Sequence, residues 1–245
     1  MTAAPDTPSW IRRVGVFDLE TTGVDVENDR IVTAHVGLLD GDGRELASKT
    51  WLVDPGIDIP AGATAIHGIT NDQVRRDGRP AAIAVTEIVS ALGSLLSQRV
   101  PVVAYNASYD FSLLDHEARR HGVARLENPQ PIIDPLVIDK AYDRYRPGKR
   151  TLEAVAARYA VSLEDAHDAS ADAVAAGRVA QALARQFTLP DSIDDLHTRQ
   201  VAWARSQAAS LTEYFIRIGR LDPEERLDGT WPVRPPRDEE ERQRR

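Results

Sequence analysis

The chain has 245 residues, a mass of 27.0 kDa and a formal net charge of −8 at pH 7. With 42% hydrophobic and 28% charged residues it can bury a full core, so disorder of the whole chain is excluded. The lack of cysteine excludes disulfides, thiolate zinc sites and cysteine nucleophiles. The negative charge argues against a protein that grips long nucleic acid by bulk electrostatics.

No membrane segment is expected from the sequence. The first ten residues lack the apolar region of a secretory signal, and no later run is long enough to cross a bilayer. We therefore expect a cytoplasmic protein with no membrane partner.

The first half of the chain predicts three strands with short links between them, at residues 14–18, 31–39 and 45–53. Short links favour antiparallel pairing. After a loop over residues 55–69, Thr70 and Gln73 have the spacing of a capping box, which predicts the start of a short helix. Pro80 then begins a longer helix with one apolar face.

The second half of the chain alternates strands with helices. Residues 100–105 form an apolar run typical of a buried parallel strand, and Ser108 is expected to cap a helix that Gly122 ends. A fifth strand and two further helices are predicted at residues 131–134, 151–160 and 168–186. The chain therefore predicts an α/β fold with a mixed five-stranded sheet flanked by helices.

Two carboxylates follow the first strand at a spacing of two residues. Asp18 and Glu20 therefore lie on one face of that strand, where two like charges are costly. A cation would offset them, and ligands that offer only oxygen favour a hard divalent ion such as Mg²⁺ or Mn²⁺. A strand that ends in an acidic pair also occurs in aspartate-nucleophile phosphatases, but the later Gly-Asp segment of such a site is not found here.

Three further residues are candidates for the same site. Asp110 is expected in the first turn of a helix, where the helix dipole favours an ionised acid. His167 precedes Asp172 by five residues, a spacing that would point them about 140° apart on one helix. We therefore expect His167 on the loop that leads into the helix and Asp172 on the helix itself. Taken alone, Asp110 is better explained as an ordinary acid at a helix N-terminus.

Taken together and in this order, these blocks resemble the DEDDh family of 3′-to-5′ exonucleases, typified by the epsilon proofreading subunit of DNA polymerase III. The resemblance covers residues 14–186 and includes three motifs, namely Asp18-Leu19-Glu20-Thr21-Thr22-Gly23, the block from Asn106 to Asp110, and the block from His167 to Asp172. Tyr109 stands where the family usually has Phe, and Asp168 is an unusual acid beside the histidine. The resemblance implies a ribonuclease H-like fold.

The resemblance also implies the chemistry. In a two-metal site the ions lie about 3.5–4 Å apart and assist in-line attack of water on phosphorus. Asp18, Glu20, Asp110 and Asp172 would hold two Mg²⁺ or Mn²⁺ ions, and His167 would take the proton from water. Carboxylates near His167 would raise its pKa, so activity is expected to rise with pH through neutrality. Substrate contacts are expected from Thr21, Thr22, His67, Asn106 and Tyr109. Alternatively, Thr21, Thr22 and His67 only turn the chain.

The resemblance and the composition together divide the chain into four regions. A flexible N-terminus at residues 1–10 precedes an exonuclease domain at residues 11–189, a helical C-terminal extension at residues 190–220, and a disordered tail at residues 221–245. The extension carries an apolar stripe, for which packing against its own domain is favoured over a partner interface. The stripe consists of Val201, Ala204, Ala208, Leu211, Phe215 and Ile218.

The expected substrate is a single-stranded or frayed DNA 3′ end, from which the enzyme would release nucleoside monophosphates. Proofreading or repair is the expected role. An RNA-trimming exoribonuclease remains an alternative, although oligoribonucleases typically have Met-Thr-Gly where this chain has Thr21-Thr22-Gly23. Another alternative is a polymerase-associated subunit in which nuclease activity is secondary. A basic cluster with interleaved tyrosines is a candidate single-strand contact or a solvated face, formed by Tyr142, Arg144, Tyr145, Arg146, Lys149 and Arg150. The oligomeric state is left open.

Overall fold

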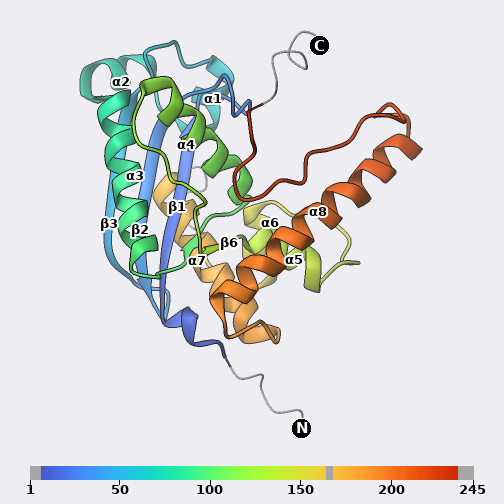
Figure 1. Cartoon of the computed structure of the whole chain (residues 1–245). Helices are drawn as coiled ribbons and strands as arrows, with labels where there is room; N and C mark the ends of the chain where they lie inside the picture. Colours follow the sequence, from blue (N-terminus) through green and yellow to red (C-terminus); the bar gives the residue numbers. More distant parts are fainter. Residues whose placement is uncertain (1–6, 164–167, 237–245) are drawn as a thin grey trace.

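The computed structural model describes residues 7–163 and 168–236 (Figure 1). Within these residues one sheet of six strands has the order β4-β3-β2-β1-β5-β6. Neighbouring strands β1, β2 and β3 are antiparallel, whereas the β1–β5, β5–β6 and β3–β4 pairs are parallel. The strands are β1 Arg13–Thr21, β2 Ile31–Asp40, β3 Glu45–Asp54, β4 Arg79–Pro80, β5 Val102–Val103 and β6 Ile132–Ile133.

The predicted α/β class and mixed sheet are confirmed, and the expected number of five strands is corrected to six in the described chain. The added strand, β4, is only two residues long and pairs Val53 with Arg79 at the sheet edge. Its second residue is Pro80, which an edge strand tolerates because it need not donate a hydrogen bond inward. So short a strand has no alternation of polar and apolar residues by which sequence could reveal it.

The helices surround this sheet and match the prediction in most places. They are η1 Ser9–Arg12, α1 Ala61–His67, α2 Asn71–Asp77, α3 Ala81–Ser97, α4 Ala107–His121, α5 Pro135–Tyr142, α6 Leu152–Arg158, α7 Ala169–Gln186 and α8 Ile193–Arg217. The predicted capping box of Thr70 and Gln73 opens α2. Helix α1 lies where a loop was expected; it begins without a side-chain cap and buries only Ala63.

Two hydrophobic layers hold the sheet between helices. On one face, Phe17 and Leu19 pack with α3 and α4; on the other, Val14 and Val16 pack with α7 (Figure 1). Because side chains alternate along a strand, Asp18 and Glu20 lie on the same face as Val16. That face is the one covered by α7.

Helix α8 and the chain that follows it cover the β6 edge of the sheet. Gln200 accepts a hydrogen bond from the Asp134 backbone N–H at 2.7 Å and donates one to the Ile132 carbonyl at 3.0 Å. His197 Nδ1 accepts from the Ile132 backbone N–H at 3.1 Å. These side chains satisfy backbone groups that an open edge strand would leave exposed.

Both ends of the described chain depart from the expected disorder. Residues 221–236 form no helix or strand, yet Trp231 is 6% exposed within the core and Val233 packs against it. At the N-terminal end Trp10 is buried and its Nε1 donates to the Pro190 carbonyl at 3.1 Å. Residues 7–10 and 221–236 thus include buried apolar side chains, although flexibility and disorder were expected there. Residues 1–6 and 237–245 lie outside the described chain.

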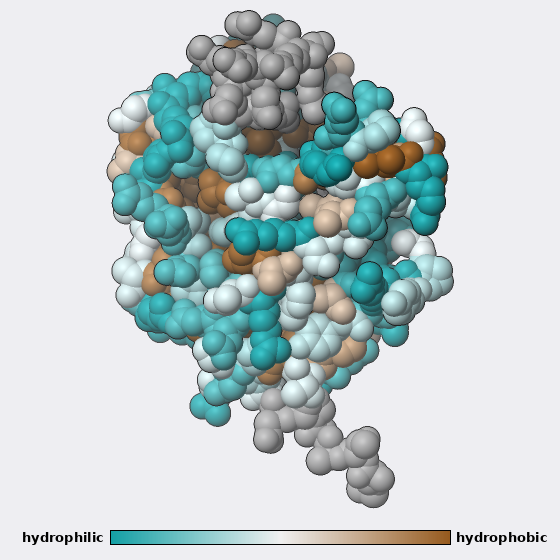
Figure 2. All heavy atoms as spheres, turned by 45° about the vertical axis from the view of Figure 1, so that its right-hand side comes forward, coloured by the Kyte–Doolittle hydropathy of each residue, from teal (hydrophilic) through white to brown (hydrophobic). Residues whose placement is uncertain are grey.

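Only the first part of the apolar stripe on α8 faces the core. Val201 and Ala204 pack against the core, whereas Leu211 and Ile218 are exposed. Figure 2 shows hydrophilic residues predominating on this side of the molecule, with apolar residues in separate patches. Within the described residues, no helix combines the length and apolar composition required to span a bilayer.

Candidate active site

Three carboxylates meet at the end of β1 that leads into residues 22–30. One carboxylate oxygen from each of Asp18, Glu20 and Asp172 lies within 4.8 Å of the other two. Asp172 stands in the first turn of α7, which packs on β1 and β2. Gly177 permits this packing, because a Cβ there would lie 2.5 Å from Val16 Cγ1. The close approach of α7 to the sheet thus sets the position of Asp172 opposite the β1 pair.

Asp110 brings a fourth carboxylate to this group. It lies in the first turn of α4 and is 3% exposed. Burial raises the pKa of Asp110, while hydrogen bonds from backbone groups, including that of Leu19, oppose the rise. Asp110 is also the foremost charged neighbour that raises the pKa of Asp18. The structure therefore brings together all four acids that the sequence singled out.

The acids destabilise one another's charged forms. Burial raises the pKa of Glu20 to about 8, and the charges of Asp172 and Asp168 contribute to the same shift. Burial, followed by the charges of Asp110, Glu20 and other acids, raises the pKa of Asp18 well above its ordinary range. Carboxylate oxygens in such close contact form the donor set that Mg²⁺ and Mn²⁺ prefer, and bound cations would neutralise their repulsion. The residues present therefore fit divalent metal binding.

The proposed base lies outside the described part of the chain. His167 falls in residues 164–167, so its expected place beside the acids stays a prediction. The adjacent Asp168 is the N-cap of α7, and its Oδ1 accepts from the backbone N–H groups of Ser170 at 2.9 Å and Ala171 at 3.1 Å. The unusual acid beside the histidine thus has a structural role, because it caps the helix that carries Asp172.

Two of the predicted substrate-binding residues contact each other across β1 and α4. The Tyr109 hydroxyl lies 2.5 Å from Thr21 Oγ1 and donates to the Gly23 carbonyl at 2.6 Å. Thr22 is buried instead; its hydroxyl donates to Asp29 at 2.7 Å and accepts from the Arg30 backbone N–H at 3.0 Å. These contacts favour the alternative in which Thr22 shapes the turn.

His67 and Asn106 stand at the ends of two helices, α1 and α4. His67 ends α1, and burial lowers its pKa while the nearby Thr21 backbone opposes that shift. Asn106 is the N-cap of α4 in the left-handed conformation, with φ 62°, and its side chain is exposed. The expected cap, Ser108, lies inside the helix. His67 thus lies near Thr21 at the end of β1, and the substrate role of both residues stays a prediction.

Asp134 is a buried acid that the sequence analysis passed over. Its carboxylate accepts from the backbone N–H groups of Asn106 at 3.0 Å and Ala107 at 2.9 Å, and so caps α4 from a distant part of the chain. It also caps its own helix, α5. The dipeptide Asp134-Pro135 carries a recognisable signal for a helix start, because aspartate is a favoured N-cap and proline a favoured first residue.

The basic cluster is divided between structural and exposed residues. Arg146 and Arg150 form ion pairs with Asp139, which is fully buried, at 2.6 and 2.5 Å. Tyr142 packs against Phe187 and Trp203. Exposed residues in the cluster include Arg144, Tyr145 and Lys149. Two of the four basic residues in the cluster, Arg146 and Arg150, thus have a structural role that requires no nucleic acid.

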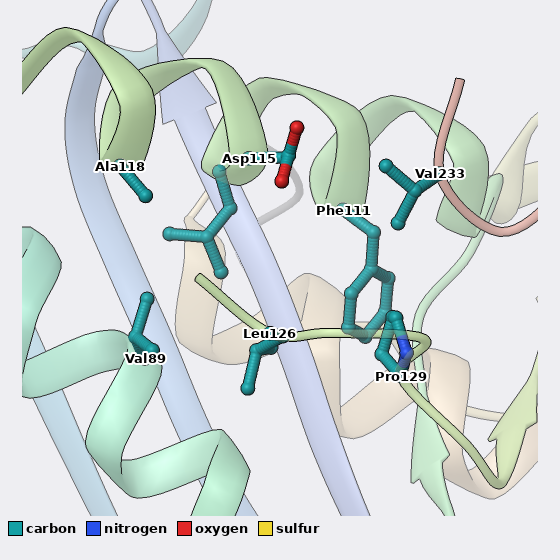
Figure 3. Close-up of a pocket in the computed structure, with 8 residues that line it drawn as sticks. Val89, Phe111, Asp115, Ala118, Leu126, Pro129 and Val233 are labelled. Atoms are coloured by element: carbon teal, nitrogen blue, oxygen red, sulfur yellow. The ribbon is translucent and has the colours of Figure 1, made fainter. Parts of the chain in front are cut away.

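A small pocket lies on another part of the molecule, between α3, α4 and the C-terminal segment (Figure 3). Its lining is apolar apart from Asp115, and includes Val89, Phe111 and Val233. Asp115 forms ion pairs with Arg119 at 2.7 Å and Arg125 at 3.6 Å. The acidic group at the end of β1 is therefore a better candidate for the functional site than this apolar pocket.

Comparison with known proteins finds relatives among bacterial DNA polymerases. The chain is 30% identical over 173 residues to the PolC-type DNA polymerase III of Lacticaseibacillus paracasei. The aligned region covers 70% of this chain and 11% of that protein. It is 27% identical to the corresponding polymerase of Latilactobacillus sakei, covering 87% of this chain and 16% of that protein.

Solved structures of exonuclease I share the fold. One has a TM-score of 0.63 at 20% identity and covers 79% of this chain and 44% of that chain. Another is the structure of the Escherichia coli enzyme in complex with a dT13 oligonucleotide. It has a TM-score of 0.59 at 20% identity, and the match covers 69% of this chain and 40% of that chain. The chain thus spans less than half the length of these relatives. The sequence profile of the RNase_T family, described as exonuclease, matches residues 16–180. The chain therefore belongs to the exonuclease family.

Proposed function

We propose that this protein is a DEDDh-type 3′-to-5′ exonuclease that hydrolyses single-stranded or frayed DNA 3′ ends to nucleoside monophosphates with the help of two divalent ions. The observation that carries the proposal is the meeting of Asp18, Glu20 and Asp172 within 4.8 Å, with Asp110 beside them. Membership of the exonuclease family supports the same reaction.

Each acid has a distinct place in this proposal. Asp18 would help to hold the ions, because the charges of Asp110, Glu20 and Asp172 all act on its carboxylate. Glu20 and Asp172 offer ligands from the side of α7, and Asp110 offers one from α4. When bound, Mg²⁺ or Mn²⁺ would supply the activation of water and the stabilisation of charge on the leaving oxygen. By its place in the family motif, His167 accepts the proton of the attacking water.

The residues proposed to contact the terminal nucleotide include two at the start of α4, the helix that carries Asp110. Asn106 is exposed at the start of α4, and Tyr109 presents a partly exposed ring one turn further on. Tyrosine and asparagine can contact a base and sugar by stacking and hydrogen bonding. DNA is the favoured substrate because the related exonuclease I structures hold DNA oligonucleotides.

A nuclease assay tests the proposal. DNA single strands labelled at the 5′ end should shorten stepwise with Mg²⁺ or Mn²⁺, and 3′-labelled strands should release labelled mononucleotide at once. RNA and a duplex with a mismatched 3′ end, assayed in parallel, establish the substrate class.

Asp172→Asn should reduce this turnover at least a hundredfold, because it removes one charge from the metal site. Its circular dichroism spectrum should match that of the wild type. Asp168→Asn is a suitable control, since asparagine also caps helices. Internal cleavage products, or full activity in EDTA, would rule out the proposed reaction.

A polymerase is the partner that the comparisons favour. In the PolC-type relatives the matching region is a small part of a DNA polymerase, which suggests that this chain also acts beside one. Pull-down with a purified replicative polymerase tests this. The informative variants replace exposed residues Leu211, Tyr214 and Ile218 with serine, because they leave the packed half of α8 intact. Equal capture by wild type and variants would remove α8 as the contact.

A further inference from the structure

The chain after α8 returns to the helix that carries Asp110. In Figure 1 this segment runs from the end of α8 back across α4. Leu227 N–H donates to Thr212 Oγ1 of α8 at 3.1 Å. Arg234 then contacts α4 twice: its backbone N–H donates to Ser112 Oγ at 2.8 Å, and its Nη2 donates to Ser108 Oγ at 2.9 Å. The segment thus connects α8 to the first turns of α4.

Trp231 lies at the centre of this connection. Its side chain is 6% exposed, its ring lies 5.0 Å from that of His197, and its Nε1 donates to Asp134 Oδ2 at 3.3 Å. The same Asp134 oxygen accepts from the Ala107 backbone N–H at 2.9 Å. The indole therefore holds the carboxylate that caps α4. Val233 continues the contact by lying beside Phe111 on α4 (Figure 3).

The start of α4 depends on this cap more than an ordinary helix does. Asn106 makes no side-chain hydrogen bond as N-cap and has a left-handed backbone, which costs free energy for a residue other than glycine. Asp134 compensates by accepting from two of the backbone N–H groups that a helix start leaves unsatisfied. The position of Asn106, and of Asp110 four residues later, therefore follows that of Asp134.

We propose that Trp231 and Asp134 are positioning residues of the active site, through which residues 219–236 hold Asn106 and Asp110 in place. This inference rests on the proposed function. It makes the segment after α8 a working part of the exonuclease domain, although the domain was expected to end at residue 189.

Trp231→Phe tests the inference, because it removes the indole N–H and keeps an aromatic ring against His197. Trp10→Phe is the matched control, since Trp10 is equally buried and donates its Nε1–H to the carbonyl of Pro190, in the loop between α7 and α8. The measurements are kcat and KM on a DNA single strand, Mn²⁺ binding by calorimetry, and the melting temperature.

We expect Trp231→Phe to lower kcat about three- to tenfold and to weaken Mn²⁺ binding, since a small displacement of a ligand is costly in such sites. Trp10→Phe should change neither, even where both variants melt at a similarly reduced temperature. Asp134→Asn should have a larger effect than Trp231→Phe. The asparagine amide would place its own N–H groups against the N–H donors from which the carboxylate now accepts hydrogen bonds.

Two outcomes separate the inference from the function on which it rests. If Trp231→Phe and Trp10→Phe have the same kcat and Mn²⁺ affinity, Trp231 only contributes packing and the inference is overturned. If the wild type fails to shorten DNA or RNA, the proposed function fails, yet weaker Mn²⁺ binding by Trp231→Phe alone still supports the positioning of Asp110.

Discussion

Among single residues, Glu20 has the most informative environment. Its pKa is raised from an ordinary value of 4.5 to about 8, so the folded protein binds a proton there more tightly than the unfolded chain does. The proton on Glu20 therefore stabilises the folded state fully below pH 4.5. This contribution to the free energy of unfolding is lost as the pH rises from 4.5 towards 8. In the absence of metal, the site therefore opposes folding at neutral and alkaline pH.

We expect the melting temperature of the metal-free protein to fall between pH 5 and about pH 8, and Mn²⁺ to restore it most at the upper end. Glu20→Gln should flatten the fall, because it removes the charge that the neighbouring acids repel. Differential scanning fluorimetry in EDTA and in Mn²⁺ measures both effects. Replacement of the exposed Glu224 by glutamine is the control. A melting temperature that stays level over this range in EDTA would contradict the argument.

Residue spacing predicts that Asp18 and Glu20 lie together, and the family resemblance adds Asp110 and Asp172, but neither reveals what supports this acidic group. Asp18 and Glu20 share a strand face by simple alternation, and Asp172 occupies the helix turn expected for it. Asp134, by contrast, acts on residues 28 positions earlier and accepts from Trp231 97 positions later. Such pairing depends on tertiary structure, which no local pattern in the sequence encodes.

At the scale of elements, the contact between α7 and β1 decides whether Asp172 meets the β1 acids. Gly177 is the point of closest approach: a Cβ there would lie 2.5 Å from Val16 Cγ1 and 2.6 Å from Leu39 Cδ1. Both neighbours are buried, so neither can move aside freely. The helix must therefore shift if this glycine acquires a side chain.

Gly177→Ala should destabilise the protein by about 1–3 kcal/mol, as overpacking does in other cores. It should also weaken Mn²⁺ binding, because α7 carries Asp172. Gly62→Ala is the control: Gly62 is exposed in α1, with nothing within 4 Å of an added Cβ, and alanine there should be neutral or slightly stabilising. Urea denaturation and calorimetry measure the two effects. Equal stability of both variants would show that α7 adjusts without cost.

The sequence predicts most elements, including the seven-residue helix α6, but not the short helices α1 and α5. Strands β1 to β3 were found from their sequence runs and short links, α3 and α8 from an apolar face, α7 from its alanine-rich composition, and α2 from its capping box. Helices α1 and α5 have seven and eight residues, too few to establish a helical period. The start of α4 was misplaced because its cap comes from Asp134, in a separate part of the chain.

For the whole molecule, the net charge of −8 limits how it can hold a polyanion. Arg146 and Arg150 of the basic cluster are paired with Asp139, and the site itself is acidic. Attraction to a nucleic acid strand therefore has to come mainly from bound cations and local contacts.

We expect the affinity for a DNA single strand to fall at least tenfold when EDTA removes divalent ions. Fluorescence anisotropy with Ca²⁺, chosen to bind without supporting rapid turnover, measures this change, and Asp172→Asn should remove most of it. Tight, strongly salt-dependent binding in EDTA would instead indicate a separate basic surface, for which exposed Arg144 and Lys149 are the first residues to replace.

The bond between Trp231 and Asp134 also has a consequence for biosynthesis. A ribosome makes the chain from its N-terminus, so every strand of the sheet is translated before Trp231 is added. A nascent chain can pair its strands while the cap of α4 still lacks the indole. Helix α4 thus receives its last support only after the indole has emerged from the exit tunnel, and until then a growing polypeptide holds Asp110 on a helix whose cap is incomplete.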